Sequence, residues 1–202
     1  ARAGRSPASV GHARGLLGLT SRLRGVASIM VRSVKDSTDQ PLRVGVIGAG
    51  VMGVNHARVF ANLPGISLRA VADPSRQQRD LITRILDVPA VENLEALLDL
   101  GVDAVTIAAP THLHHDIALK CIARGVHVLV EKPIASTVEE GREIIAAARA
   151  AGVTLMVGHV ERFNPAVQAI KDAIEDEEIL SIAITRVGPF PPRMSNVGVV
   201  ID

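Results

Sequence analysis

The segment Leu42–Gly53 constrains the fold of this chain more than any other part of its sequence. A short apolar run, LRVGVI, leads into the glycine pattern G-x-G-x-x-G, and a helical pattern follows. Gly48 permits a tight turn after the strand, Gly50 lets a pyrophosphate approach the backbone, and Gly53 lets the helix pack against the strand. The first amide groups of the helix then bind phosphate. The segment predicts a dinucleotide-binding βαβ unit rather than a glycine-rich turn without a ligand.

A carboxylate follows the second predicted strand, where such a unit meets the adenosine ribose. Residues 66–72 have an apolar strand pattern, and Asp73 comes directly after them, 20 residues beyond Gly53. An acidic residue at about this distance accepts hydrogen bonds from the ribose hydroxyls and repels a 2′-phosphate. Asp73 therefore predicts a preference for NAD, while Arg76, three residues later, leaves NADP possible.

The composition favours buried parallel strands. Of the 202 residues 48% are hydrophobic, three are Phe, and none is Tyr or Trp, so the core must consist of Val, Ile, Leu and Ala. Parallel strands crossed by alanine-rich helices have this composition. The single cysteine excludes an internal disulfide and fits a reducing, cytoplasmic compartment. No apolar run approaches the ~18 residues of a membrane span, so no membrane partner is expected.

Charge divides the chain near residue 35. Residues 1–35 hold seven Arg and Lys side chains and no acidic one, whereas residues 36–202 hold 15 basic and all 21 acidic side chains. An acid-free leader rich in Arg and Ser resembles an organellar transit peptide. A basic arm for nucleic acid would carry interleaved aromatic residues, which this leader lacks, so no nucleic-acid partner is expected. Because the first methionine is Met30 and the composition builds no core, we expect residues 1–40 to be a disordered or spurious extension.

From Leu42 onward strand and helix patterns alternate, which predicts an α/β fold with a Rossmann-type, doubly wound parallel sheet. Beyond residues 42–72, helices are expected at residues 75–86, 94–100, 114–124, 138–151 and 165–174, and strands near Val91 and at 102–109, 126–130 and 154–158. The capping box Thr137-Val138-Glu139-Glu140 marks one helix start.

The pattern changes near residue 160, which predicts a nucleotide-binding domain at residues 41–160 and the beginning of a second domain at 161–202. In this second part we expect strands at 179–187 and 197–201, separated by a proline-containing loop. A central strand at a chain end would leave backbone groups unpaired, so we expect the sequence to be truncated within the second sheet.

Polar groups follow directly on several predicted strands, where the ligands of open parallel sheets bind. Besides the glycine loop and Asp73, these groups are Ala109-Pro110-Thr111-His112, Glu131-Lys132-Pro133 and His159-Val160-Glu161-Arg162. Glu131 and Lys132 are the pair best suited to chemistry, because a lysine beside a hydroxyl assists proton movement while the glutamate fixes a ribose or tunes the lysine. The alternative is an exposed ion pair of little energetic weight.

The histidines His112, His114 and His115 suggest a metal site, but we expect none. A carboxylate cluster of suitable spacing does not accompany them, and the three positions cannot share one helix face. His114 is expected at a helix start facing the cofactor, with His115 exposed to solvent.

Three motifs together resemble the Gfo/Idh/MocA family of glucose–fructose oxidoreductase, inositol dehydrogenase and rhizopine catabolism proteins. They are VGVIGAG from Val44, Ala108-Ala109-Pro110-Thr111 followed by His114, and Glu131-Lys132-Pro133 with Val157-Gly158-His159 beyond. The resemblance covers residues 42–202. It implies an NAD(P)-dependent dehydrogenase that moves hydride between nicotinamide and a secondary alcohol of a sugar, nucleotide sugar or cyclitol. It also implies an α+β second domain that holds the substrate and forms a homo-oligomer.

Motifs and resemblance together assign the site. Lys132 matches the family's catalytic lysine, Glu131 and Pro133 shape the nicotinamide site, and Asp73 holds the adenosine ribose. The expected cofactor-binding residues are Gly48, Ala49, Gly50, Val51, Met52, Gly53, Asp73, Arg76, Ala109, Pro110, Thr111, His114, Glu131, Lys132 and Pro133. The expected substrate-binding residues are His159, Arg162 and Asn164.

The end of the chain refines this expectation. The stretch Glu161-Arg162-Phe163-Asn164-Pro165 and residues 199–202 are most similar to members that act on nucleotide-linked N-acetylhexosamines. Asp202 matches the first residue of the family's D-x-G-x-H-x-x-D segment, whose histidine acts as acid/base on the substrate. Loss of a general base typically costs about 10²–10⁴ in rate, so we expect this polypeptide to bind cofactor but turn over poorly.

Two other classes of protein are weighed against a dehydrogenase. A non-catalytic nucleotide-binding or regulatory module would keep the fold but would have no use for Lys132. A methyltransferase can share a similar glycine-rich loop, but Glu131-Lys132-Pro133 and Arg162-Phe163-Asn164-Pro165 speak against it.

Overall fold

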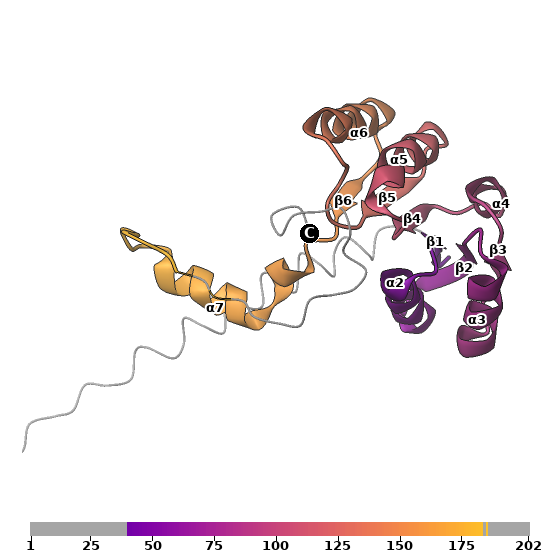
Figure 1. The fold of residues 1–202 in the computed structure, drawn as a ribbon, viewed down its shortest axis with the longest axis horizontal. Helices are drawn as coiled ribbons and strands as arrows, with labels where there is room; N and C mark the ends of the chain where they lie inside the picture. Colours follow the sequence, from indigo (N-terminus) through magenta and orange to yellow (C-terminus); the bar gives the residue numbers. More distant parts are fainter. Residues whose placement is uncertain (1–39, 184, 186–202) are drawn as a thin grey trace, which may run out of the picture. The chain divides into compact units, whose positions relative to one another are not determined.

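A computed structural model describes residues 40–183 and 185, which form an α/β fold around a parallel sheet (Figure 1). The strands are β1 (Leu42–Ile47), β2 (Ile66–Ala72), β3 (Ala90–Val91), β4 (Ala104–Ile107), β5 (His127–Val130) and β6 (Leu155–Val157). Their order is β3-β2-β1-β4-β5-β6, and every neighbouring pair is parallel. This is the strand order of a doubly wound nucleotide-binding fold, with its switch point between β1 and β4. The predicted fold class is confirmed.

The helices begin and end close to the predicted positions. They are α2 (Val51–Asn62), α3 (Arg76–Leu86), α4 (Leu94–Asp99), α5 (His114–Ala123), α6 (Val138–Ala151) and α7 (Pro165–Ile174), with short 3₁₀ turns η1 (Thr111–Leu113) and η2 (Val160–Phe163). At the start of α6 the Thr137 side chain accepts from the Glu140 amide, and Glu140 reaches back to the Thr137 amide. The capping box satisfies two amide groups that the helix leaves without an internal partner.

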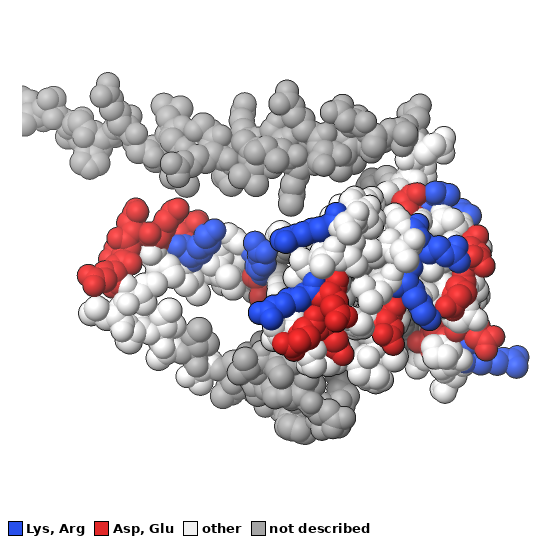
Figure 2. Space-filling model, turned by 90° about the horizontal axis from the view of Figure 1, so that it is seen from above, with Lys and Arg blue, Asp and Glu red and all other residues white. Residues whose placement is uncertain are grey.

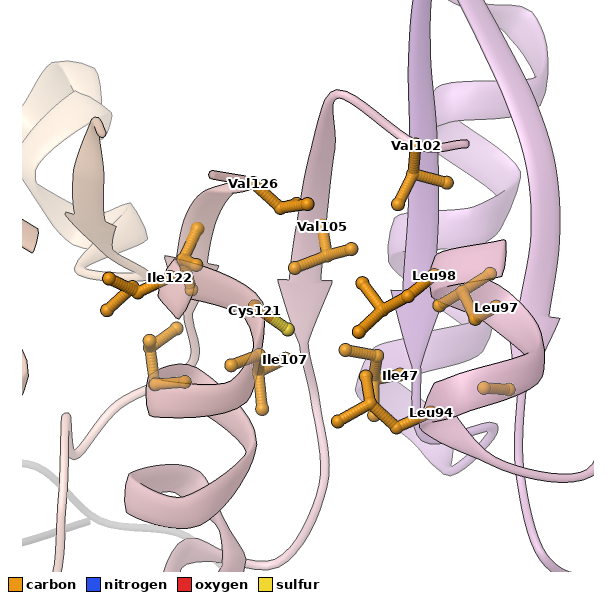
Figure 3. Close-up of a cluster of buried hydrophobic side chains, with 14 of the residues drawn as sticks. Ile47, Leu94, Leu97, Leu98, Val102, Val105, Ile107, Cys121, Ile122 and Val126 are labelled. Carbon is orange, nitrogen blue, oxygen red and sulfur yellow. The ribbon is translucent and has the colours of Figure 1, made fainter. Parts of the chain in front are cut away.

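Aliphatic side chains fill both faces of the sheet. One cluster joins Val46 and Val71 of the sheet to α2 and α3 through Ala57 and Ile82. The other packs β4 between α4 and α5, with α6 beyond, and Figure 3 shows its side chains converging around Val105 and Ile107. Each fully buried Ile or Leu contributes about 2 kcal/mol of burial energy. The sheet therefore forms a firm base for the loops at its carboxyl edge.

Cys121 lies in the larger cluster and is fully buried. Desolvation raises the pKa of its thiol to about 12. A thiol with so high a pKa carries almost no thiolate at neutral pH and is chemically inert while buried.

The structure departs from the prediction after α7. Residues 179–183 and 185 have no regular structure, although a strand was expected over 179–187. A strand needs neighbouring strands with which to exchange backbone hydrogen bonds, and pattern alone does not provide them. The remainder of that strand, the predicted strand at 197–201 and the N-terminal extension up to residue 39 lie outside the described residues.

Charges are distributed unevenly along the chain. In Figure 2 basic and acidic side chains are interspersed over the unit that holds the sheet, whereas acidic side chains gather where the chain leaves α7. The residues there are Glu175, Asp176, Glu177 and Glu178, all exposed. Within residues 40–183 and 185, we find no helix with the length and apolar character needed to cross a bilayer.

Candidate cofactor and active site

The glycine loop joins β1 to α2 at the carboxyl edge of the sheet. Gly48 has φ +95°, and a Cβ there would lie 2.6 Å from the Ala108 carbonyl oxygen. A Cβ on Gly53 would overlap the Gly48 carbonyl. Gly50 is exposed, and a Cβ there would meet nothing within 4 Å. The loop is thus closely packed beneath Gly48 and Gly53 and open in front of Gly50.

The start of α2 supplies the donors for a phosphate. Gly50 is its N-cap and provides no side-chain cap, so the first amides of the helix keep their donor capacity. Val51 and Met52, in the first turn, are both exposed. A pyrophosphate against Gly50 would meet these amide groups and the positive end of the helix dipole.

Asp73 sits at the end of β2 and is directed at this loop. Its Oδ2 accepts from the Ala49 amide at 2.7 Å, and its Oδ1 accepts from the Ser75 amide at 2.8 Å. These two hydrogen bonds hold the carboxylate beside the glycine loop. Arg76 begins α3 and is highly exposed, with its guanidinium 4.0 Å from Asp80.

The buried side chain of His114 contacts the turn after β4. Its imidazole is 1% exposed, with Nε2 2.8 Å from the Ala109 carbonyl oxygen and Nδ1 2.9 Å from that of Pro133. His114 therefore links the turn at Ala109-Pro110-Thr111 to the turn after β5. Both ring nitrogens are occupied by carbonyl oxygens of the protein, so the side chain shapes the site through the backbone.

Glu131, Lys132 and Pro133 form the turn after β5. Glu131 is buried, and its Oε2 accepts from the Lys132 amide at 3.2 Å; the Lys132–Pro133 peptide bond is cis. Lys132 itself is exposed. The predicted pair therefore lies at the carboxyl edge of the sheet with the glutamate buried and the lysine exposed.

His56 is the residue that sequence analysis missed. It lies in α2, and its Nε2 is 2.7 Å from Glu131 Oε1 across a separation of 75 residues. Its position three residues after Gly53 places it on the second turn of the phosphate-binding helix, which is the signal that could have drawn attention to it.

The predicted substrate residues belong to the segment after β6. His159 precedes η2, and the Arg162 amide donates to its carbonyl oxygen at 3.1 Å. Asn164 caps α7 by accepting from the Ala166 amide, and its side-chain amide donates to Glu161. His159 lies next to the site, because the residue before it, Gly158, packs against Glu131. Within the part of the chain that the structure describes, the hydrogen bonds of Arg162 and Asn164 connect them only to residues 159–168 and not to the glycine loop, Asp73 or Lys132.

The residues present fit a nicotinamide dinucleotide. The open space in front of Gly50 and the first amides of α2 suit the pyrophosphate of such a cofactor. The carboxylate of Asp73 beside the loop suits the ribose. Among the residues that the structure describes, no group of three or more His, Cys, Asp or Glu side chains is arranged to hold a metal ion. Fold and site together define an NAD-binding Rossmann domain.

The comparison with known families agrees. Residues 42–159, more than half of the chain, match the family model described as "Oxidoreductase family, NAD-binding Rossmann fold". The chain belongs to this Gfo/Idh/MocA oxidoreductase family, and the resemblance stated from its motifs is confirmed.

Individual relatives carry dehydrogenase names. The UDP-N-acetylglucosamine 3-dehydrogenase of Acidithiobacillus ferrooxidans is 33% identical over 168 residues, which are 80% of this chain and 50% of the relative. The NAD(+)-dependent scyllo-inositol 2-dehydrogenase of Bacillus subtilis is 33% identical over 70% of this chain and 42% of its own length. This chain thus spans about half the length of these relatives.

A solved structure shows the same fold with ligands. The WlbA dehydrogenase of Bordetella pertussis, in complex with NADH and UDP-GlcNAcA, superposes with a TM-score of 0.64 at 29% identity. The match covers 67% of this chain and 43% of that one.

Proposed function

We propose that this chain is the cofactor-binding part of an NAD-dependent dehydrogenase that oxidises a secondary alcohol of a sugar or nucleotide sugar. The observation that carries the proposal is the placement of Lys132. It is exposed at the end of β5, on the same edge of the sheet as the glycine loop and Asp73. Similarity to a UDP-N-acetylglucosamine 3-dehydrogenase and to WlbA supports a nucleotide-sugar substrate.

The residues of the site divide the work between them. Asp73 would hold the adenosine ribose and disfavour a 2′-phosphate, and the amides of α2 would bind the pyrophosphate. When bound, the nicotinamide ring accepts a hydride at C4. Lys132 would hold the oxygen of the reacting alcohol and stabilise its negative charge as the hydride leaves. Removal of the alcohol proton is assigned to the histidine of the family's D-x-G-x-H-x-x-D segment, of which Asp202 would be the first residue.

Further properties follow from the same proposal. We place the enzyme in the cytoplasm, and we expect its second domain, beginning near residue 161, to bind the substrate and join subunits in a homo-oligomer. A cyclitol of the inositol type is a second candidate substrate, favoured by the similarity to scyllo-inositol 2-dehydrogenase.

Binding distinguishes the proposal from a methyltransferase. The 202-residue chain should enhance NADH fluorescence on titration and should show no heat of binding with S-adenosylmethionine by calorimetry. Binding of S-adenosylmethionine in place of NADH would contradict the assignment.

Substitution of the lysine distinguishes an enzyme from a regulatory module. In the product of the complete coding sequence, Lys132→Ala should lower kcat by about 10²–10⁴, with little change in NADH affinity. Lys120→Ala is the matched control, because Lys120 is an exposed lysine on α5 that pairs with Glu95. Equal turnover by both variants, measured over a panel of nucleotide sugars and inositols, would show that Lys132 has no role in catalysis.

A further inference from the structure

A histidine of the phosphate-binding helix contacts the glutamate beside the proposed catalytic lysine. His56 Nε2 lies 2.7 Å from Glu131 Oε1, and the two side chains are only 15% and 9% exposed. The imidazole also stacks on Phe60, with ring centroids 6.2 Å apart and planes inclined by 26°. The imidazole thus packs against a ring of its own helix and contacts the glutamate that follows β5.

The Glu131 carboxylate has a closely packed place. Its second oxygen, Oε2, accepts from the Lys132 amide. A Cβ on Gly158, at the end of β6, would come within 3.2 Å of all three atoms of the carboxyl group. A carboxylate this far from water is costly unless donors satisfy it, and the His56 imidazole and the Lys132 amide both contact it within hydrogen-bond distance.

The topology gives this contact a particular meaning. α2 starts at the glycine loop after β1, whereas Glu131 directly follows β5, and β4 lies between β1 and β5 in the sheet. The hydrogen bond therefore joins the element that binds the pyrophosphate to the turn that carries Lys132. Asp73 and the glycine loop, which hold the adenosine half, depend on contacts with β2 and β4 instead.

We propose that His56 is a positioning residue for the nicotinamide half of the site. By holding the Glu131 carboxylate it fixes the Glu131-Lys132-Pro133 turn, and it thereby sets the place of Lys132 relative to the cofactor helix. This inference rests on the proposed function. The nicotinamide site then depends on a side chain of α2, which neither the glycine motif nor the Glu131-Lys132-Pro133 motif indicates by itself.

Two substitutions that differ in reach test the idea. In His56→Gln the terminal amide nitrogen falls near the place of the imidazole Nε2 and can still donate to Glu131, whereas in His56→Asn the shorter side chain cannot reach it. The matched control is His115→Asn, because His115 on α5 makes an equally short contact, 2.8 Å, with Glu143 on α6. All variants of the 202-residue chain are first checked for cooperative thermal unfolding. Should His56→Asn fail this check, His56→Ala, which suits a helix interior, repeats the comparison.

The first measurement compares NADH with ADP-ribose, which lacks the nicotinamide. We expect His56→Asn to weaken NADH binding by about tenfold, as befits the loss of a hydrogen bond to a charged group, and to leave ADP-ribose affinity within twofold. His56→Gln should recover most of the NADH affinity, and His115→Asn should match the wild type. The second measurement, hydrogen exchange without cofactor, should show faster exchange of the Lys132 amide in His56→Asn but not in His56→Gln.

The outcomes separate the possible failures. Equal losses of NADH and ADP-ribose affinity, or a Gln variant no better than the Asn variant, would overturn the positioning role while leaving the proposed function intact. A wild-type chain that binds ADP-ribose but gains nothing from the nicotinamide would overturn the proposed function itself, and the inference with it.

Discussion

The two edges of the sheet use carboxylates in different ways. At the amino edge Asp103 receives the Arg43 guanidinium at 2.6 and 3.0 Å and the Arg43 amide at 2.9 Å. At the carboxyl edge Asp73 is held by two backbone amides, and Glu131 by an amide and a histidine. At the amino edge the carboxylate forms an ion pair with an arginine of the same chain. The carboxyl edge instead holds its carboxylates with backbone amides and an imidazole, at the end of the sheet where the ligands of open parallel sheets bind.

The sharpest way to break the carboxyl edge is to add a single methyl group to the glycine loop. In Gly53→Ala the new Cβ overlaps the Gly48 carbonyl, so the backbone must shift. We expect the free energy of unfolding to fall by about 3 kcal/mol and NADH binding to be lost. Urea titration and NADH fluorescence measure the two losses. Gly50→Ala is the control: its Cβ meets open space, so it should cost far less stability than Gly53→Ala, no more than the change of an N-cap residue, while weakening NADH binding. Equal stability losses in both variants would contradict the structure.

The next change removes a carboxylate but keeps the loop. Asp73→Ser should shift the ratio of NADPH to NADH affinity about tenfold toward NADPH, because the repulsion of the 2′-phosphate and a ribose acceptor are both lost. Parallel titrations with the two reduced cofactors measure the ratio. An unchanged ratio would remove Asp73 from the ribose site. Asp103→Asn, at the other edge, should bind both cofactors like the wild type.

The smallest effect is expected at the amino edge and concerns stability alone. The hydrogen bond from Arg43 lowers the pKa of Asp103 below its ordinary 3.8. A carboxylate with a depressed pKa in the folded state contributes stability above its unfolded pKa and loses it as the pH falls through the folded value. Asp103→Asn should therefore lower Tm slightly at pH 7, and the difference from the wild type should shrink as the pH falls below about 3.8. A difference that grows in acid would have the wrong sign for this ion pair.

Much of the fold was accessible from the sequence because its signals are local. The strand, the glycines and the helix start of the first βαβ unit lie within a dozen residues, and the spacing to Asp73 follows from the length of one crossover. The start of α6 was predicted from Thr137 and Glu140 for the same reason, since a capping box needs only four consecutive residues.

Contacts between elements far apart in the sequence could not be predicted, because they depend on how these elements pack in three dimensions. Glu131 could be assigned to a strand end, but its contact with His56 depends on how α2 lies over the sheet. Likewise His114 was expected to face the cofactor, yet both its nitrogens meet carbonyl oxygens from two separate turns. The strand expected at 179–187 had a suitable pattern, but a pattern does not provide the neighbouring strand that residues 179–183 would need.

Because Cys121 is buried in the core, the rate at which its thiol is modified reports ligand binding. Because it is the single thiol of the chain and its pKa is raised to about 12, reagents can modify it only when the core opens. A ligand that binds the folded state suppresses that opening by the factor 1 + [L]/Kd. The labelling rate at Cys121 should therefore fall as NADH is added, by about 100-fold at a concentration of 100 Kd.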